Sequence, residues 1–540
     1  MVSIVFIGGV GMGFDLIIQG GTVVDGTGGA SYCADVGIKN GQITGIGDLS
    51  ASECPTVLNA TNLVVAPGFI DIHSHSDFTV LVDPRAQSSI YQGITTELIG
   101  NCGHGCAPIT APDQFIGNIY GYTTDLSIDW HSYKEYTERL VDVRPAINLA
   151  PLIPNGNLRI ASVSDHTRPS TGSEIVTMVN VLEEAMQQGA YGYSSGLDSA
   201  VEKESSQLEL IELAKVVAKH DGIYACHTRN KEVEAVEAIE EAIDVAESSG
   251  SALQISHIIP RRGGAIGARE RAIQAMETAL DRGLDVGFDQ HTREHGITNL
   301  SAALPPGSLA GGIARNSALL KESYFRDSVR AHESLIASFG RGGWDHVYVY
   351  RADLQNHLVG KSIADLTSSN YDAWDVILDI LLAHVEKVEN PMVVCHSYTQ
   401  QEIKATLLHP MCTVGSDATA LCSDGPLSGT DFPGSYTWAA WFYRHFVTEA
   451  SDLTLEQAVR KLTGQPADRL GIHGRGHLRI GARADVAVFD PVCFRPMGTF
   501  DNPSVLAEGM THVVVNGGVA LRDGVETGAR FGRVLRKGSA

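Results

Sequence analysis

Short apolar segments separated by glycine-containing turns mark both ends of this chain. Residues 14–66 contain F-D-L-I-I-Q-G-G-T-V-V-D-G and D-V-G-I-K-N-G-Q-I-T-G-I-G, in which K-N-G-Q is typical of a tight β-hairpin. Residues 476–523 repeat this style, with A-D-V-A-V-F-D and H-V-V-V-N-G-G-V-A-L. We therefore expect 14–66 and 474–540 to build one discontinuous β-sandwich domain.

The middle of the chain alternates short apolar runs with amphipathic stretches. Residues 174–188, 207–220 and 232–248 carry apolar side chains at i, i+3 and i+4, which predicts helices. Alternating strands and helices favour a parallel sheet with right-handed crossovers. The candidate strands are 63–72, 96–100, 146–152, 190–194, 222–226, 252–256, 284–289, 392–395 and 412–415.

These nine candidate strands are one more than an eight-stranded barrel needs. We interpret 291–390 as an insertion after the seventh barrel strand, and 392–395 belongs either to that insertion or to the barrel. The predicted fold is α/β, a (β/α)8 TIM-like barrel over 67–290 and 391–473 with the β-sandwich domain beside it. The insertion is rich in helices, contains Trp344, Tyr348 and Tyr350, and is expected to cover the cleft.

Composition narrows the class of protein. The chain has 540 residues, 43% of them hydrophobic and 19% charged, which is ordinary for a globular protein with a large core. A net charge of −23 argues against nucleic acid and anionic membranes as partners. No apolar run approaches the roughly 20 residues that span a bilayer. The apolar first 13 residues lack the basic start of a signal peptide, and an alternative start at Met12 is compatible with them. Nine thinly spread cysteines indicate a reducing cytoplasm rather than a disulfide scaffold.

The segment P-G-F-I-D-I-H-S-H-S-D (67–77) carries the first candidate chemistry. Side chains at i and i+2 of a strand point to the same face, so His73 and His75 can reach one metal ion. Asp71 and Asp77 add carboxylates nearby. Two surface histidines at a strand end are the alternative interpretation.

Further metal-binding residue types follow other candidate strands. Cys102 follows T-T-E-L-I-G-N, His227 ends G-I-Y-A-C-H, His257 ends A-L-Q-I-S-H, and Asp417 ends C-T-V-G-S-D. Each alone could be a packed or hydrogen-bonded residue. The carboxyl ends of barrel strands meet at one end of a barrel, where catalytic residues gather. Their recurrence there favours a metal centre.

With these residues in order, the chain resembles the amidohydrolase superfamily and, within it, the N-acyl-D-amino-acid deacylases (D-aminoacylases). The resemblance spans the chain from Gly13. Its nearer motifs are G-N-C-G (100–103), G-Y-S-S-G-L (192–197), Y-A-C-H-T-R (224–229), L-Q-I-S-H (253–257), F-D-Q (288–290), V-G-S-D (414–417) and G-R-G-H-L-R-I-G-A-R-A-D-V-A-V-F-D (474–490).

The resemblance implies a particular metal arrangement, in which a cysteine stands where many amidohydrolases use a carboxylated lysine. Cys102, His227 and His257 would hold one tightly bound Zn²⁺. His73, His75 and Asp417 would form a second, weaker site that Cys102 could bridge. Thiolate and imidazole are suitable zinc donors.

The implied reaction is hydrolysis of a linear amide C–N bond by metal-activated water, most simply of an N-acyl-D-amino acid or a related N-acyl compound. Asp417 would act as general base and then as general acid toward the departing amine. Asp424, in a second S-D-G, is a rival for this role. The small-molecule amide is the expected partner, and the oligomeric state, including a homo-oligomer, is left open.

Several candidate substrate-binding positions depart from the family pattern. In the deacylases an arginine at the place of Arg229 binds the substrate carboxylate; a surface salt bridge is the alternative. Ile259 stands where a lysine is expected, H-T-R (291–293) where Y-P-Y is expected, Ser199 where a tyrosine is expected, and D-F-P-G (431–434) where H-P-R is expected. Further candidates for substrate contacts are Ser195, Arg261, His291, Arg293 and His295. The substrate could therefore be a different amide.

Two other functions remain open. Cyclic-amide hydrolases of the hydantoinase or dihydroorotase kind carry a metal-bridging lysine on the fourth strand, and residues 190–197 contain none. A non-catalytic binding descendant of the fold is the other alternative, and the full set of six metal and base residues argues against it.

Overall fold

Short parallel strands form the centre of the computed structural model, which describes residues 13–115, 119–121, 126–305, 308–309, 311–388, 390–499 and 502–538. Most of these strands are entirely buried, because helices cover the outside and side chains fill the inside. The barrel strands are β6 Phe69–Asp71, β7 Ile94–Ile99, β8 Asn148–Pro151 with β9 Ile153–Pro154, β10 Gly192–Gly196, β11 Ile223–His227, β12 Ala252–Ile255, β13 Val286–Gln290 and β17 Cys412–Val414. The apolar start of the chain, residues 1–12, lies outside the described residues.

The parallel pairings close into a ring. One set runs β6-β7-β8 and the other β9-β10-β11-β12-β13-β17. Only Leu152 separates β8 from β9, and its N–H donates to Ile99 O of β7 at 2.8 Å. A parallel bridge between Ser74 and Ala418 joins the end of β6 to the end of β17. With β8 and β9 counted as one interrupted strand, eight parallel strands have their carboxyl ends at one end of the barrel, which confirms the predicted fold class.

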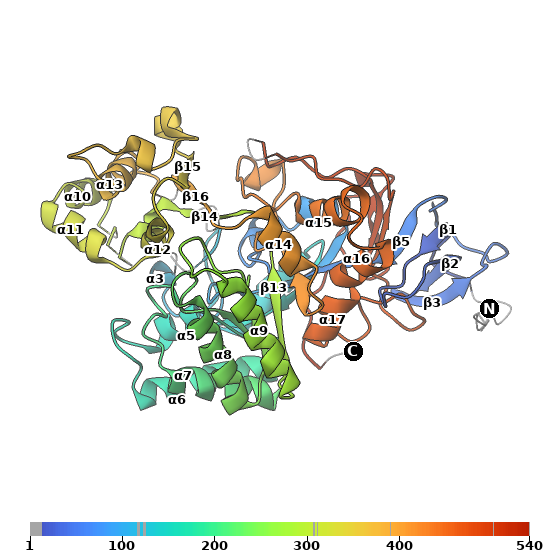
Figure 1. Cartoon of the computed structure of the whole chain (residues 1–540). Coiled ribbons are helices and arrows are strands. Elements are labelled where there is room, and N and C mark those ends of the chain that lie inside the picture. The colour runs from blue at the N-terminus through green and yellow to red at the C-terminus, as the bar shows by residue number, and fades with distance from the viewer. Residues whose placement is uncertain are drawn as a thin grey trace.

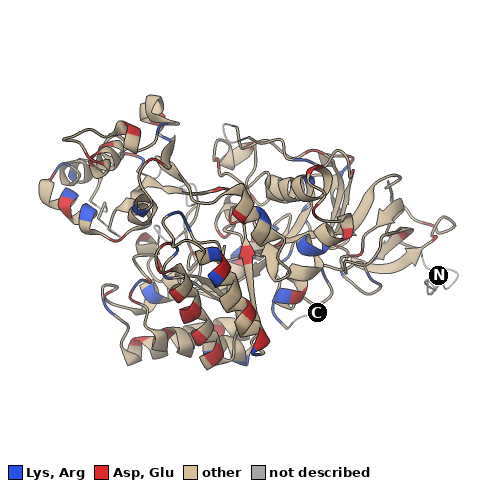
Figure 2. Ribbon diagram, viewed as in Figure 1, with Lys and Arg blue, Asp and Glu red and all other residues tan. Residues whose placement is uncertain are grey.

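Helices pack outside the barrel and include the three that were predicted. Thr171 and Glu174 form a capping box that starts α6, and the Ser206 side chain accepts from the Glu209 N–H at the start of α7. Helices α5 to α9 lie along one flank of the barrel (Figure 1). In Figure 2, many positions on the ribbons of these helices are coloured red for Asp and Glu. The helices of this part are α1 Thr79–Val82, α2 Gln87–Ile90, α3 Pro112–Phe115, α4 Tyr133–Val143, α5 Asn155–Ser162, α6 Gly172–Gln187, α7 Gln207–Lys219, α8 Ala235–Ser249, α9 Ala268–Asp281, α14 Gln400–Leu407, α15 Trp438–Tyr443, α16 Leu455–Leu462 and α17 Gly464–Leu470.

The two chain ends share one sheet, seen at the right of Figure 1. Its strands are β1 Leu16–Val23, β2 Tyr32–Lys39, β3 Gln42–Gly47, β4 Val57–Asn59, β5 Val64–Pro67, β18 Val486–Phe489, β19 Met510–Val515, β20 Gly518–Arg522 and β21 Val525–Glu526. Strand β5 connects the halves, because it pairs parallel with β1 and antiparallel with β18. The predicted hairpin is confirmed: Asn40 and Gly41 link β2 to β3 with φ of 51° and 75°.

The segment after β13 forms a separate small sheet with helices around it (yellow in Figure 1). Its elements are β14 His295–Asn299, α10 Ile313–Leu319, α11 Ser323–Ala331, α12 Leu335–Arg341, β15 Val347–Arg351, α13 Ala373–Ala383 and β16 Met392–His396. Strand β16 pairs antiparallel with both β14 and β15, so 392–396 belongs with this sheet and not with the barrel.

Contacts hold this inserted segment against the carboxyl end of the barrel. Ser338 of α12 donates to Glu232 Oε1 at 2.5 Å, and Arg261 lies over the Phe339 ring at 5.5 Å from its centroid. An apolar cluster joins Val394 of β16 to residues of the loop after β17, and Tyr348 and Tyr350 pack against it, whereas Trp344 packs on Trp374. The insertion therefore adjoins the loops that carry the candidate site.

Among the described residues, no helix combines the length and apolarity needed to cross a membrane. All nine cysteines lie in the described part of the chain and are free.

Candidate metal centre

Four side chains from four strand ends converge at the carboxyl end of the barrel. The ligand atoms of His73, Cys102, His257 and Asp417 all lie within 4.8 Å of one another. Cys102 Sγ is 3.2 Å from His73 Nε2 and 3.5 Å from His257 Nε2. The chain thus brings together residues that are up to 344 positions apart because β6, β7, β12 and β17 end at the same level of one barrel.

The H-S-H pair meets Asp417. Asp417 Oδ1 is 3.2 Å from His75 Nε2 and 3.5 Å from His73 Nε2, so one carboxylate oxygen faces both imidazoles. The His75 Nδ1 atom is buried and has no hydrogen-bond partner among the described residues.

His227 stands beside this group. Its ring centroid lies 4.5 Å from that of His257, and its Nε2 is 2.8 Å from Asp198 Oδ2. His227 also contributes a hydrogen bond that lowers the pKa of the Cys102 thiol. All six residues predicted as metal ligands therefore lie in or next to one cluster.

Three of these residues have backbone conformations that are uncommon for side chains other than glycine. The φ angles are 53° at Cys102, 36° at His257 and 45° at Asp417. Such conformations cost on the order of 1–3 kcal/mol each and concentrate at functional sites. A neighbouring glycine allows one of them: a Cβ at Gly196 would lie 2.1 Å from Cys102 O, so only glycine lets the Cys102 loop approach β10 this closely.

The electrostatics of the cluster favour anionic donors. Burial would raise the pKa of the Cys102 thiol, but the charge of His73 and hydrogen bonds from His227 and His257 outweigh it and hold that pKa well below its usual value. Burial would likewise raise the pKa of Asp417, but the hydrogen bond from His75 and the charges of His73 and Arg293 hold it well below its usual value. The cluster therefore presents a thiolate and a carboxylate among imidazoles.

This donor set fits a zinc ion. Thiolate sulfur, imidazole nitrogen and carboxylate oxygen are the three ligand types that zinc takes in proteins. Cys102, His73, His257 and Asp417 follow fixed strand ends and supply four such ligand atoms within one small volume.

Residues behind the ligands hold the imidazoles in place. Asp289 Oδ1 accepts from His73 Nδ1 at 3.1 Å and from the His257 backbone N–H at 2.8 Å. Lys231 Nζ lies 2.9 Å from His257 Nδ1; burial, followed by the charge of Arg261, lowers the pKa of Lys231 to about 8. Asp198, Lys231 and Asp289 were not among the residues predicted from the sequence to form the site. Of these three residues, only Asp289 ends an apolar run, as the predicted ligands do, so its sequence position alone indicated a place at the site.

Two of the candidate substrate residues meet Asp417. Arg293 donates from Nη2 to Asp417 Oδ2 at 3.0 Å and from Nη1 to Ser416 O at 2.6 Å. Its guanidinium lies over Phe432, 5.3 Å from the ring centroid. His291 Nε2 is 3.9 Å from Asp417 Oδ2. Both residues lie at the metal cluster.

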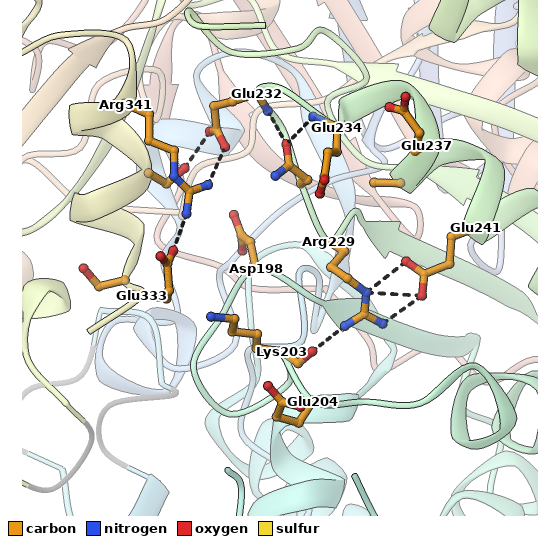
Figure 3. Close-up of a pocket in the computed structure, with 14 residues that line it drawn as sticks. Asp198, Lys203, Glu204, Arg229, Glu232, Glu234, Glu237, Glu241, Glu333 and Arg341 are labelled. Carbon is orange, nitrogen blue, oxygen red and sulfur yellow. Dashed lines mark hydrogen bonds and ion pairs between the residues drawn. The ribbon is translucent and has the colours of Figure 1, made fainter. Parts of the chain in front are cut away.

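Arg229 lies along the wall of a separate cavity of about 480 Å³ that also reaches Asp198 (Figure 3). Its guanidinium donates to Glu241 at 2.8 and 3.0 Å and to Ser205 O at 2.8 Å. Seven acidic residues line this cavity against three basic ones: Asp198, Glu204, Glu232, Glu234, Glu237, Glu241 and Glu333, with Lys203, Arg229 and Arg341.

The remaining candidate residues have other partners. Arg261 pairs with Asp198 at 3.3 Å and with Glu232 at 3.2 Å. Ser195 shares a 2.9 Å hydrogen bond with Tyr224 OH within the barrel wall and is not brought to the metal cluster. His295 lies on β14, with its ring 5.8 Å from that of His396.

The fold and the donor group together define a barrel of the metal-dependent hydrolase class. The chain belongs to the Amidohydrolase family, whose model matches residues 56–347 and 402–520. It is 31% identical to N-acyl-D-glutamate deacylase of Alcaligenes xylosoxydans xylosoxydans, over 97% of this chain and 96% of that protein. It is 28% identical to D-aminoacylase of the same organism, over 98% of both chains.

The fold of this chain is also similar to that of a solved deacylase structure. N-acyl-D-glutamate deacylase from Bordetella bronchiseptica, complexed with zinc and a phosphonate inhibitor that mimics the tetrahedral intermediate, is similar with a TM-score of 0.77 at 27% identity. The match covers 97% of this chain and 100% of that chain. These similarities confirm the predicted resemblance to the D-aminoacylases.

Proposed function

We propose that this protein is a zinc-dependent amidohydrolase that removes the acyl group from an N-acyl-D-amino acid. The observation that carries the proposal is the convergence of His73, Cys102, His257 and Asp417 at the carboxyl end of the barrel. Relatives that cover nearly the whole chain are named for N-acyl-D-glutamate deacylation and as D-aminoacylase, which supports a linear amide over a cyclic one.

In this proposal Cys102, His227 and His257 hold one zinc ion tightly, and His73, His75 and Asp417 form a second, weaker position. The bound metal supplies Lewis-acid chemistry, polarising the scissile carbonyl and activating water. The low pKa of Cys102 supports its place in the tight site, because a zinc ligand must be deprotonated.

Asp417 is the proposed proton carrier. Its Oδ2 is oriented by Arg293 at 3.0 Å, while Oδ1 faces the H-S-H pair. The carboxylate would accept a proton from the attacking water and deliver it to the departing nitrogen. The rival Asp424 is 67% exposed and pairs with Arg85, which favours Asp417.

A second candidate substrate is an N-acyl compound without a carboxylate on its amine portion. Arg229, Arg261 and Arg293 are each already paired with a carboxylate of the protein. The cavity beside Arg229 carries more acidic than basic residues. A carboxylate substrate would therefore have to displace one of these ion pairs or bind elsewhere.

A hydrolysis screen of the zinc-loaded protein tests the proposal. The panel holds N-acetyl-D- and N-acetyl-L-amino acids with acidic, neutral and basic side chains, N-acetyl amines, and cyclic imides. We expect D-amino acid substrates to be cleaved and activity to be lost on chelation. Cleavage of N-acetyl amines alone would favour the second candidate. Activity that survives complete removal of the metal would contradict the zinc-dependent function.

The nine free cysteines support a reducing cytoplasm as the location of this enzyme.

A further inference from the structure

A buried lysine contacts one of the proposed zinc ligands. Lys231 follows β11, is 2% exposed, and places Nζ 2.9 Å from His257 Nδ1. The same Nζ lies 3.2 Å from Ser256 O and also donates to His257 O. Lysine is almost never fully buried unless its ammonium is paired, because desolvation is costly. These three partner atoms of Nζ belong to Ser256 and His257, the two residues that follow β12.

This arrangement differs from that of the neighbouring histidines. The ring nitrogen that faces away from a metal normally bonds to a carboxylate or a backbone carbonyl, which fixes the orientation of the ring. His73 follows this rule with Asp289 at 3.1 Å, and Nε2 of His227 lies 2.8 Å from the Asp198 carboxylate. In contrast, the outer nitrogen of His257 meets an amine.

The loop that carries Lys231 is itself fixed. Arg261 N–H donates to Lys231 O at 2.6 Å, and Asn230 Oδ1 accepts from the Glu232 N–H at 2.8 Å. The Nζ position is therefore set by the backbone contacts of its own loop and by the carbonyls of Ser256 and His257, which follow β12.

We propose that Lys231 is a positioning residue for the metal centre. It holds the His257 ring from the Nδ1 side, so that Nε2 faces Cys102 Sγ at 3.5 Å. Its two carbonyl contacts also hold the β12 terminus, where His257 has a φ of 36°. Lys231 Nζ makes three contacts: it shares one proton with His257 Nδ1, and two of its N–H groups donate to the two carbonyls. The inference rests on the proposed function through the assignment of His257 as a zinc ligand.

The chain offers a matched control lysine. Lys461 of α16 is 7% exposed and donates to His409 O and Cys412 O, both at 2.9 Å. Cys412 begins β17, so Lys461 lies near the amino end of that strand, whereas Asp417 follows its carboxyl end. Lys461 thus shares the burial and the two carbonyl partners of Lys231 but contacts no proposed metal ligand.

The test is zinc affinity without substrate. Metal-free full-length protein competes for zinc with a chromophoric chelator, as wild type, Lys231→Met and Lys461→Met. We expect Lys231→Met to bind zinc roughly 10- to 100-fold more weakly, the cost of losing a residue that orients a ligand. Lys461→Met should bind zinc as the wild type does, even if both variants melt at a lower temperature. Wild-type affinity in Lys231→Met, or an equal loss in Lys461→Met, would overturn the proposal.

Two further variants separate positioning from general stability. In a His257→Ala background, Lys231→Met should cause no additional loss of zinc affinity, whereas a full additional loss would show that Lys231 does not act through His257. If Lys231→Met does not fold, judged by circular dichroism, Lys231→Gln replaces it, and an unchanged zinc affinity there counts against the proposal. Because zinc binding is measured without substrate, a wrong substrate assignment would leave these results intact.

Discussion

Two buried polar clusters in this protein differ in how completely their atoms are paired. At the joint between barrel and terminal sheet, Arg475 pairs with Asp485. Asp485 Oδ2 also accepts from Asn148 Nδ2 at 3.1 Å, and Oδ1 accepts from the Asn516 N–H at 2.7 Å. Arg475 donates in addition to Asn516 Oδ1 at 2.7 Å. Donors meet acceptors throughout, so this network connects β8 of the barrel to the sheet.

The cluster at the other end of the barrel strands is arranged differently. Sulfur, nitrogen and oxygen atoms of Cys102, His73, His257 and Asp417 converge on one small volume. Three of the four residues have positive φ angles. The Arg475 network stabilises the fold by pairing donors with acceptors, and the converging ligand atoms of this cluster make no comparable set of pairs. Converging lone pairs, held by strained backbone, are what a metal site requires. The difference between a paired network and a convergent one separates structural from functional polar residues.

The largest expected effect is a loss of zinc binding. Cys102→Ala removes the thiolate of the tight site, so we expect zinc affinity to fall by more than about 100-fold, beyond the loss caused by an orienting partner. Zinc per protein after dialysis measures this. Cys106→Ala is the control, since Cys106 is also a buried free thiol but is not in the converging group. Full zinc occupancy in Cys102→Ala would remove Cys102 from the ligand set.

Asp417 should affect rate more than folding. Asp417→Asn keeps the shape of the side chain but cannot carry a proton, so we expect kcat to fall by roughly 10²- to 10⁴-fold. Steady-state kinetics on the preferred substrate measures the change. Asp424→Asn, at the exposed Arg85 pair, should retain nearly wild-type kcat. If the two variants behaved in the opposite way, the general base would be Asp424.

Breaking the Arg475–Asp485 network should lower the stability of the fold without changing zinc affinity. Asp485→Ala leaves Arg475 buried without its carboxylate, which we expect to lower the free energy of unfolding by about 3–5 kcal/mol. Urea denaturation measures this, with zinc affinity followed in parallel. Glu508→Ala breaks the exposed Arg495 pair and should cost about 1 kcal/mol or less. A large loss of zinc affinity in Asp485→Ala would undermine the contrast between the clusters.

The most gradual expected effect is a pH dependence of stability near the Cys102 loop, spread over several pH units. Glu202 accepts from the Gly196 N–H at 2.8 Å, and burial, only partly offset by that hydrogen bond, raises the pKa of Glu202 to about 8. The pKa of glutamate in an unfolded chain is about 4.3. Between these values the unfolded chain binds fewer protons than the folded one, so stability falls as pH rises, by at most about 1.4 kcal/mol per pH unit.

Glu202→Gln removes this titration. Urea denaturation at several pH values between the two pKa values should show a shallower decline for Glu202→Gln than for the wild type. Identical slopes for both proteins would mean that Glu202 is already ionised in the folded state.

Local sequence patterns predicted much of the fold. Alternating apolar runs and amphipathic stretches indicated the barrel strands and helices α6, α7 and α8, and K-N-G-Q marked the β2–β3 hairpin. The pattern could not assign 392–396, because a buried apolar run looks the same in a barrel and in an antiparallel sheet. Only its pairing with β14 and β15 placed it in the insertion.

The sequence by itself determined which residue types follow the barrel strands, and strand ends are a local property that apolar runs reveal. It therefore pointed to His73, Cys102, His227, His257 and Asp417. Tertiary structure alone decided which loop residues surround them, because long side chains from neighbouring loops reach in directions that no periodicity encodes. In the folded protein Arg293 donates to Asp417, Arg229 forms an ion pair with Glu241, and Lys231 contacts the His257 ring.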